Sequence, residues 1–317
     1  MNVTYSNNRA SLAAAGALTA CALAVLLFAE GCAPGYSGGN SIEALGGGGS
    51  TEPTVSIKPD ASAESDGGDS GGPVAVAGYG SVSGRVVLEG GQPVLTPLLP
   101  GGQLRDPSAC IRENIPDYRV VVGPNNGLAN VFVFLPRKPK GTPEEAETPP
   151  ETSIEFDQKF CTFKPHALLM RAGQTVRVLN SDPVAHNTHT LPKSNGSFNN
   201  AVKENDDVGL PLVYQRGERE PVRVVCDFHA WMLAWHLPLD HPYGAVTGDA
   251  GSVTLSDVPA GKHKFAVWHE GRKIGDYSVE VQPDQTTPLD VTIESSSLAQ
   301  LRPAQPPKSV VLSFGSP

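Results

Sequence analysis

The stretch Val225-Cys226-Asp227-Phe228-His229-Ala230-Trp231-Met232 places a thiol, an imidazole and a thioether within seven residues of one another. It follows the short apolar run 221–226, which predicts a β-strand leading directly into it. Thiolate, imidazole and thioether together can hold Cu(I) and still accept Cu(II). A type 1 copper site uses two imidazoles, one thiolate and a long axial thioether, so this stretch supplies three of the four ligands. The alternative is that Cys226 and Met232 fill an apolar core and His229 is incidental.

The positions of the histidines favour a metal site around this stretch. All eight histidines lie within residues 166–269, an interval that brackets the stretch. The second imidazole must come from elsewhere in the chain, and His186 is the leading candidate. His189 is its competitor. Because an odd offset places two side chains on opposite faces of an extended segment, only one of the two should face the metal.

The chain around this stretch has the pattern of an all-β protein. Residues 128–135 read Leu-Ala-Asn-Val-Phe-Val-Phe-Leu, a strand that is apolar on both faces and therefore predicted to be buried in a sandwich. Residues 163–179 predict two strands joined at Ala172-Gly173, Pro259-Ala260-Gly261 predicts a hairpin, and the polar residues 191–211 predict an irregular loop. Since short strands alternate with turns throughout, we expect β-sandwiches. Further strands are expected at residues 81–88, 252–255, 264–268, 277–281 and 289–293.

Two motifs, in this order, carry a family resemblance. The upstream motif is Phe163-x-Pro165, Gly173-Gln174-Thr175-Val176, Asn180-x-Asp182 and His186-Asn187, and the downstream motif is Cys226-x-x-His229-x-x-Met232. With them, residues 154–245 resemble the cupredoxins, the plastocyanin- and amicyanin-like blue copper proteins. The resemblance implies a Greek-key β-sandwich that holds one type 1 copper per chain through four ligands: His186, Cys226, His229 and Met232. It also implies that Asn187 links the two ligand-bearing loops, which favours His186 over His189.

The stretch departs from the family pattern at three positions. Val224 stands where an aromatic residue is usual, and Asp227 and Trp231 stand in a loop that is proline-rich in amicyanin-like proteins. These differences bear on the redox potential and the exposed face more than on metal binding. The edge of His229 is expected to face solvent. The nearby aromatic residues form either an apolar docking patch or ordinary core: Phe228, Trp231 and Trp235.

A second resemblance covers the flanks of this region. It rests on Gly84-Arg85-Val86 with Gly91-Gln92-Pro93-Val94, and on the later run 251–261, which ends in Val258-Pro259-Ala260-Gly261. These segments resemble a carboxypeptidase regulatory-like, or transthyretin-like, β-sandwich module. We therefore expect residues 80–153, which include an acidic loop, and residues 246–294 to form a second small sandwich. The arrangement is similar to that of exported planctomycete-type lipoproteins, in which a blue copper segment is embedded in such a frame.

The N-terminal residues 1–32 predict an export signal. The run 11–29 is uncharged and rich in Ala and Leu, and a small residue precedes Cys32 as in a bacterial lipoprotein signal. Cys21 is the alternative lipidation site, and a plain cleaved signal or an uncleaved span are further alternatives. Residues 33–79 predict a flexible tether rich in Gly, Ser, Pro and acidic residues. We expect a protein anchored to a membrane through a lipid, in the periplasm or on the outer cell surface.

Three cysteines remain in the part that is expected to fold. If Cys226 binds a metal, Cys110 and Cys161 form an even pair that can bridge. If it does not, three thiols remain and one of them has no partner for a disulfide. Disulfides persist in exported proteins, so the metal hypothesis also predicts a disulfide between Cys110 and Cys161. Residues 295–317 predict a flexible tail.

Charge and motifs argue against two other classes of function. The formal net charge is −9 and no cluster of Lys and Arg opposes it, which argues against nucleic acid as a partner. The chain carries no Ser/His/Asp arrangement with a nucleophile signature, no phosphate-binding loop and no Cys-x-x-Cys-His haem motif. We therefore expect a protein that is not an enzyme.

Together these patterns predict a type 1 copper electron-transfer protein, a one-electron carrier outside the cytoplasm. Its redox partner is expected to be a cytochrome or a dehydrogenase. One alternative is a non-redox cell-surface β-sandwich that binds polysaccharide or protein. Another is a copper storage or delivery protein that binds more than one copper per chain with the help of His189, His236 or His241.

Overall fold

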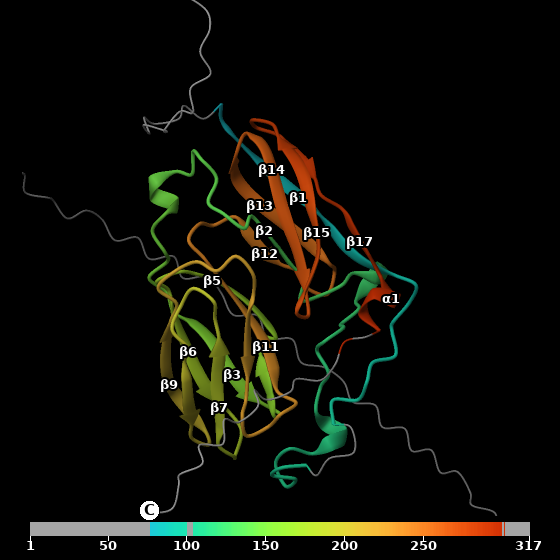
Figure 1. The fold of residues 1–317 in the computed structure, drawn as a ribbon, viewed down its shortest axis with the longest axis vertical. Coiled ribbons are helices and arrows are strands. Elements are labelled where there is room, and N and C mark those ends of the chain that lie inside the picture. The colour runs from blue at the N-terminus through green and yellow to red at the C-terminus, as the bar shows by residue number, and fades with distance from the viewer. Residues whose placement is uncertain (1–76, 100–103, 300, 302–317) are drawn as a thin grey trace, which may run out of the picture. The chain divides into compact units, whose positions relative to one another are not determined.

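The computed structural model describes residues 77–99, 104–299 and 301, and strands dominate within them. The strands form four sheets (Figure 1), which confirms the predicted all-β sandwich class. The helical elements of the described residues are three 3₁₀ turns and α1 (Ser295–Leu298). None of these helices is long and apolar enough to span a membrane. The predicted export signal with Cys21 and Cys32, nearly all of the tether and most of the tail lie outside the described residues.

The first sandwich is organised around β1 (Tyr79–Glu89). β1 pairs antiparallel with β13 (Ser252–Pro259) and parallel with β16 (Thr286–Pro288) and β17 (Val291–Glu294). The second sheet has the order β12-β2-β14-β15, formed by β12 (Gly244–Val246), β2 (Phe132–Phe134), β14 (Gly261–His269) and β15 (Arg272–Val281). Successive side chains of a strand point to opposite faces, so the inward side of β1, with Val82 and Val86, joins one apolar core with Phe265 of β14.

The second sandwich contains the two motifs. One of its sheets has the order β4-β3-β6-β9, formed by β4 (Thr162–Lys164), β3 (Ile154–Lys159), β6 (Thr175–Asn180) and β9 (Asp206–Val213). The other has the order β5-β11-β10-β7-β8, formed by β5 (Ala167–Arg171), β11 (Leu233–Leu239), β10 (Val222–Val225), β7 (His186–Leu191) and β8 (Asn199–Val202). Phe156 of β3 and Val224 of β10 are fully buried in the apolar core that both sheets share.

The second sandwich is inserted into the first. β2 and β12 are antiparallel neighbours with Phe134 opposite Gly244, although β3 to β11 lie between them in the sequence. The chain therefore leaves the first sandwich after β2 and returns to it at β12. A further apolar cluster joins the two sandwiches, in which Trp235 of β11 makes an edge-to-face contact with Trp268 of β14 at 4.5 Å between ring centroids.

Two sequence predictions are wrong at the level of elements. The predicted loop 191–211 contains β8 and most of β9, which are both edge strands. β8 is largely exposed and polar, and β9 contains Gly209 and Pro211, so neither shows the regular apolar alternation of a strand. The predicted hairpin at Pro259-Ala260-Gly261 does not form, because β13 pairs with β1 whereas β14 pairs with β2 and β15. Gly261 has φ +135°, a conformation suited to glycine, and the chain passes from one sheet to the other there.

Residues 104–119, which we call the cap segment, lie between β1 and β2 in the sequence but contact the second sandwich. A disulfide joins Cys110 of this segment to Cys161, in the turn between β3 and β4, with 5.5 Å between the Cα atoms. The other end of the segment is fixed by Arg119, which is buried and pairs with Asp117. Arg119 also donates hydrogen bonds to the backbone carbonyls of Thr96 and Leu301.

Candidate metal centre

Strands β7 and β10 bring the two motifs together. They are antiparallel neighbours with Val225 opposite His189, so Cys226, directly after β10, lies beside the beginning of β7. His186 is the first residue of β7 and is fully buried. His189 points to the other face, where its Nδ1 lies 3.1 Å from Oδ2 of Asp227. The structure thus places His186, and not His189, with Cys226.

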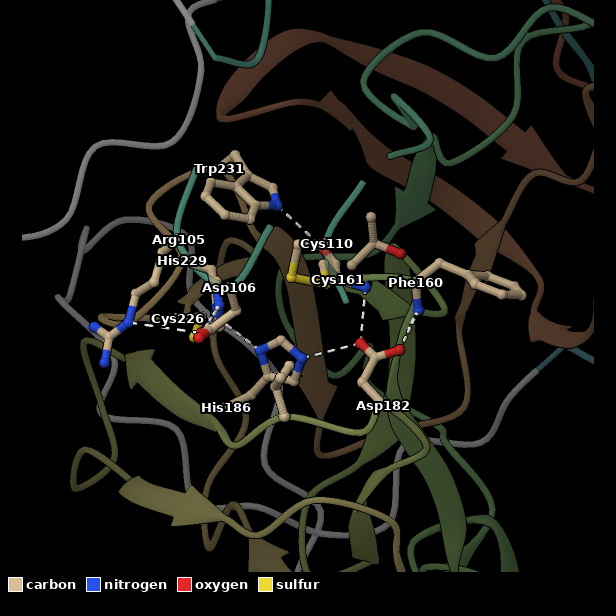
Figure 2. Close-up of a disulfide and its surroundings, with 12 residues drawn as sticks. Arg105, Asp106, Cys110, Phe160, Cys161, Asp182, His186, Cys226, His229 and Trp231 are labelled. Carbon is tan, nitrogen blue, oxygen red and sulfur yellow. Dashed lines mark hydrogen bonds and ion pairs between the residues drawn. A yellow bond between two sulfur atoms is a disulfide. The ribbon is translucent and has the colours of Figure 1, made fainter. Parts of the chain in front are cut away.

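Three potential ligand atoms converge at this end of the second sandwich (Figure 2). Nδ1 of His186 lies 2.8 Å from Nδ1 of His229, and Nδ1 of His229 lies 3.7 Å from Sγ of Cys226. All three side chains are fully buried. Met232 is buried in the same apolar cluster as Cys226, and its backbone amide donates a hydrogen bond to the carbonyl of His229. The four residues predicted from the sequence therefore lie in one buried region.

A carboxylate contacts the outer nitrogen of each imidazole. Nε2 of His186 lies 2.9 Å from Oδ2 of Asp182, and Nε2 of His229 lies 3.0 Å from Oδ2 of Asp106. Because an ionised carboxylate only accepts hydrogen bonds, each Nε2 is the donor. This leaves Nδ1 of both rings as the inward-facing nitrogen. Carboxylates hold metal-binding histidines in the same way and fix the tautomer of the ring.

This arrangement favours a cation between the two histidines. With each Nε2 protonated, two neutral imidazoles present two Nδ1 lone pairs to each other at 2.8 Å, which is repulsive. A metal ion between them removes the repulsion. A soft sulfur atom lies beside the same point, so the donor set fits a thiolate-binding metal such as copper or zinc.

The surroundings shift the protonation of these groups. Burial and, to a smaller extent, the neighbouring His186 lower the pKa of His229 to about 4, while its hydrogen bond to the Asp106 carboxylate acts in the opposite direction. His229 is therefore neutral, with a free lone pair, at neutral pH. Burial raises the pKa of the Cys226 thiol, although backbone hydrogen bonds from Asn187 and from the stretch itself oppose the shift. A metal must displace the thiol proton to bind.

The Asp182 carboxylate is held in its charged form. Burial alone would raise its pKa, but hydrogen bonds from His186 and from the backbone amides of Cys161 and Phe160 lower it overall. These amides donate to its two oxygens at 2.7 Å each. Asp182 therefore connects His186 to the backbone amides of Phe160 and of the disulfide-bonded Cys161.

Asn187 ties the two motif-bearing segments together. Its backbone amide donates to Sγ of Cys226 at 3.5 Å, and its side-chain oxygen accepts the backbone amide of Asp227 at 2.6 Å. Its side-chain nitrogen donates to Asp227 and to Asn199 of β8. These contacts hold Cys226 and His186 at a fixed separation, the linking position that the sequence predicts for Asn187.

The surface of the site differs from the sequence prediction. The edge of His229 does not face solvent: its side chain is 0 % exposed, because Asp106 of the cap segment covers it. Of the two alternatives for the nearby aromatic residues, Trp231 and Trp235 agree with ordinary core packing, because both are buried, whereas Phe228 is half-buried. Trp231 makes an edge-to-face contact with His229 and donates its indole N–H to the carbonyl of Cys161.

Sequence reasoning missed the roles of Asp106 and Asp182. Asp182 lies four residues before His186, so its position within the upstream motif is a usable signal. Asp106 lies 123 residues before His229, and nothing in the sequence around it indicates a metal site.

A second metal centre is not evident in the part of the chain that the structure describes. Cys161, Asp182 and His186 also place ligand atoms within 4.8 Å of one another, but the sulfur of Cys161 is bound in the disulfide. His236, His241 and His269 are buried and belong to no such group among the described residues. No protein-family model matches the chain, and no curated protein matches it.

Proposed function

We propose that this protein is a mononuclear copper protein that carries single electrons, with His186, Cys226, His229 and Met232 as the ligands. The observation that carries the proposal is the convergence of two Nδ1 atoms and one sulfur atom in a buried site where carboxylates occupy both Nε2 atoms. The resemblance of the two motifs to cupredoxins supports the same assignment and the Greek-key topology.

The donor set favours copper over zinc. A structural zinc site takes four thiolate, imidazole or carboxylate ligands. Here one thiol and two imidazoles converge, and a thioether lies in the same apolar cluster. This matches the ligands of a blue-copper site, which are two imidazoles, one thiolate and a weak axial thioether. Asp106 and Asp182 contact the imidazoles through Nε2, on the side of each ring away from Nδ1. They serve as hydrogen-bond acceptors for the rings.

The protein groups hold the ligands and exclude water. Copper supplies a one-electron couple when bound. His186 comes from the start of β7 and the other proposed ligands from the segment after β10, so the sheet fixes their separation before any metal enters. Burial of all four residues keeps solvent from the site. An electron carrier of this kind needs no catalytic acid or base. A cytochrome or dehydrogenase outside the cytoplasm is the proposed partner, and a lipid on the N-terminal region the proposed anchor.

The test is the visible spectrum and metal content of the full chain after addition of Cu(II). We expect one copper per chain and an intense thiolate-to-copper charge-transfer band. The band should disappear in Cys226→Ser and in His186→Ala. His189→Ala is the matched control and should keep the band, because His189 contacts Asp227 on the other face of β7.

Each alternative gives a different result in the same experiment. More than one bound copper would indicate storage or delivery, and a colourless chain that binds zinc would contradict the electron carrier. A chain that binds neither metal would leave the non-redox binding module as the better hypothesis.

A further inference from the structure

The candidate metal site is covered by residues that lie outside the inserted sandwich in the sequence but contact it in space. Asp106 of the cap segment lies 3.0 Å from Nε2 of His229, 123 residues away in the sequence. The neighbouring Arg105 lies over the ring of Phe228 at 5.0 Å from the centroid, and its guanidinium donates to the carbonyl of Phe228 at 3.5 Å. Two adjacent residues of the cap segment therefore cover two adjacent residues of the Cys226–Met232 stretch. Figure 2 shows Arg105 and Asp106 beside His229.

The disulfide fixes the position of Asp106. The carbonyl of Asp106 accepts the backbone amides of Ala109 and Cys110 at 3.0 and 2.8 Å, which makes a tight turn that ends at the disulfide. On the other side of the disulfide, the amide of Cys161 donates to Asp182, the carboxylate that contacts His186. The two carboxylates that orient the two histidines are thus attached to opposite halves of one covalent cross-link.

The backbone of Asp106 also has an unusual conformation. Its φ is 51°, in the left-handed region that most residues other than glycine avoid, although Asp and Asn tolerate it better than most. Such a conformation persists only where the surroundings enforce it. Here the turn and the disulfide do so, and the result directs the carboxylate at His229.

We propose that Asp106 is a positioning residue of the metal centre. It holds His229 with Nε2 protonated and Nδ1 turned toward Cys226 and His186, and it seals the site through a cap segment that the Cys110–Cys161 disulfide fastens. This inference rests on the proposed function for the identity of the metal. The positioning and the sealing themselves are properties of the protein that can be measured without metal.

The contact differs from an ordinary surface ion pair. Exposed pairs contribute little because water screens both partners. Asp106 is 39 % exposed, but its partner His229 is fully buried, so loss of the carboxylate leaves a buried N–H without an acceptor. Loss of such a hydrogen-bond partner typically lowers metal affinity by about 10- to 100-fold.

The first measurement uses the metal-free full chain with Cys21→Ser and Cys32→Ser, in which Cys226 is the remaining free thiol. The rate at which a small aromatic disulfide reagent labels Cys226 reports how often the site opens. Asp106→Ala should raise the rate roughly tenfold. Asp106→Asn should stay near the starting rate, because its amide oxygen still accepts from His229. Asp207→Ala, an exposed carboxylate on β9, is the control and should leave the rate unchanged.

The second measurement is copper affinity and the visible spectrum of the same variants. Asp106→Ala should weaken binding by about 10- to 100-fold and shift the thiolate-to-copper band, and Asp106→Asn should restore most of both. Equal labelling of Asp106→Ala and the starting protein would overturn the positioning role whatever the metal does. Faster labelling of Asp106→Ala in a chain that binds no copper would overturn the proposed function and leave the role of Asp106 intact.

Discussion

Cys226 carries a proton that a metal has to displace. Burial raises the pKa of its thiol, so the thiol form dominates at neutral pH. Each metal ion that binds the thiolate therefore releases one proton. His229 adds no proton in this range, because its pKa lies at about 4.

Copper affinity should consequently increase with pH by roughly tenfold per unit between about pH 6 and about pH 8. Competition with a chelator of known affinity at several pH values measures the slope. His189→Ala should show the same slope as the unmodified chain, since His189 lies on the other face of β7. An affinity independent of pH would mean that Cys226 is already ionised before metal arrives.

His236 makes the stability of the second sandwich depend on pH. Its ring is buried against Phe156, and its Nδ1 lies 3.1 Å from the hydroxyl of Tyr214. Burial lowers its pKa to about 3, whereas an unfolded histidine titrates near its ordinary value of about 6.5. Between these values the unfolded chain binds the additional proton, so the free energy of unfolding falls as the pH falls.

The predicted loss from His236 is up to about 1.4 kcal/mol per pH unit below about pH 6.5. Urea denaturation at a series of pH values gives the slope. His236→Leu should flatten it by about one proton. Tyr214→Phe removes the hydrogen-bond partner but keeps the titrating ring, so it should lower stability without flattening the slope to the same extent. An unchanged slope in His236→Leu would contradict the argument.

The ligand candidates could be selected from the sequence because they are close together or embedded in recognisable spacing. Cys226, His229 and Met232 lie within seven residues of one another. His186 and His189 could be told apart because an odd offset places them on opposite faces of β7. The burial of His229 could not be predicted in this way. It depends on Asp106, whose approach requires a fold in which a segment of one sandwich covers the end of another.

At the level of elements, the cap segment depends on its disulfide. The cross-link between Cys110 and Cys161 spans 51 residues and fastens a segment whose described part has no strand and only one 3₁₀ turn. A cross-link of that span restricts the unfolded chain substantially, and its contribution to stability is expected to be about 2–4 kcal/mol.

Cys110→Ala together with Cys161→Ala should therefore lower the free energy of unfolding by about 2–4 kcal/mol. Hydrogen exchange should rise first in residues 104–119 and around His229, because these lose their covalent attachment. Residues of β14 and β15 serve as the internal control, since they belong to the first sandwich. A uniform rise in exchange over the whole chain would argue against a local role for the disulfide.

The strands that could be predicted are those with strong apolar patterns. Residues 128–135 include β2, and the turn at Gly173 joins β5 to β6. β8 and β9 are not predicted, because β8 is polar and exposed and β9 contains Gly209 and Pro211, which are signals of a loop. The partners of β13 and β14 could not be derived either, because a short turn between two strands has the same local sequence whether they pair with each other or enter different sheets.

At the scale of the whole molecule, a buried hydrogen-bonded pair of side chains contributes to the contact between the sandwiches. Nε2 of His166, just before β5, lies 2.5 Å from Oε1 of Glu270, in the turn between β14 and β15. Both side chains are almost completely buried. Removing one partner of such a pair leaves the other buried without its hydrogen-bond partner, which typically costs about 1–3 kcal/mol.

Glu270→Leu should lower the free energy of unfolding by about 1–3 kcal/mol, measured by denaturant titration. His166→Leu combined with Glu270→Leu should recover much of that loss, because no unpaired polar group remains in the contact. Additive losses in the double variant would show that the two residues do not act as a pair.

The insertion of one sandwich into the other determines the order in which the molecule can be completed during synthesis. β1 is the first strand of the described residues to leave the ribosome. Its partners β13, β16 and β17 lie near the end of the described chain, where the strands run from β13 to β17. The cap segment, then β2, then β3 to β11 emerge between them, and this stretch includes Cys110, Cys161 and all four proposed ligands. The second sandwich and the cap segment can therefore fold and form their cross-link before β1 meets its partners, so the first strand of the described residues to be made is among the last to be paired.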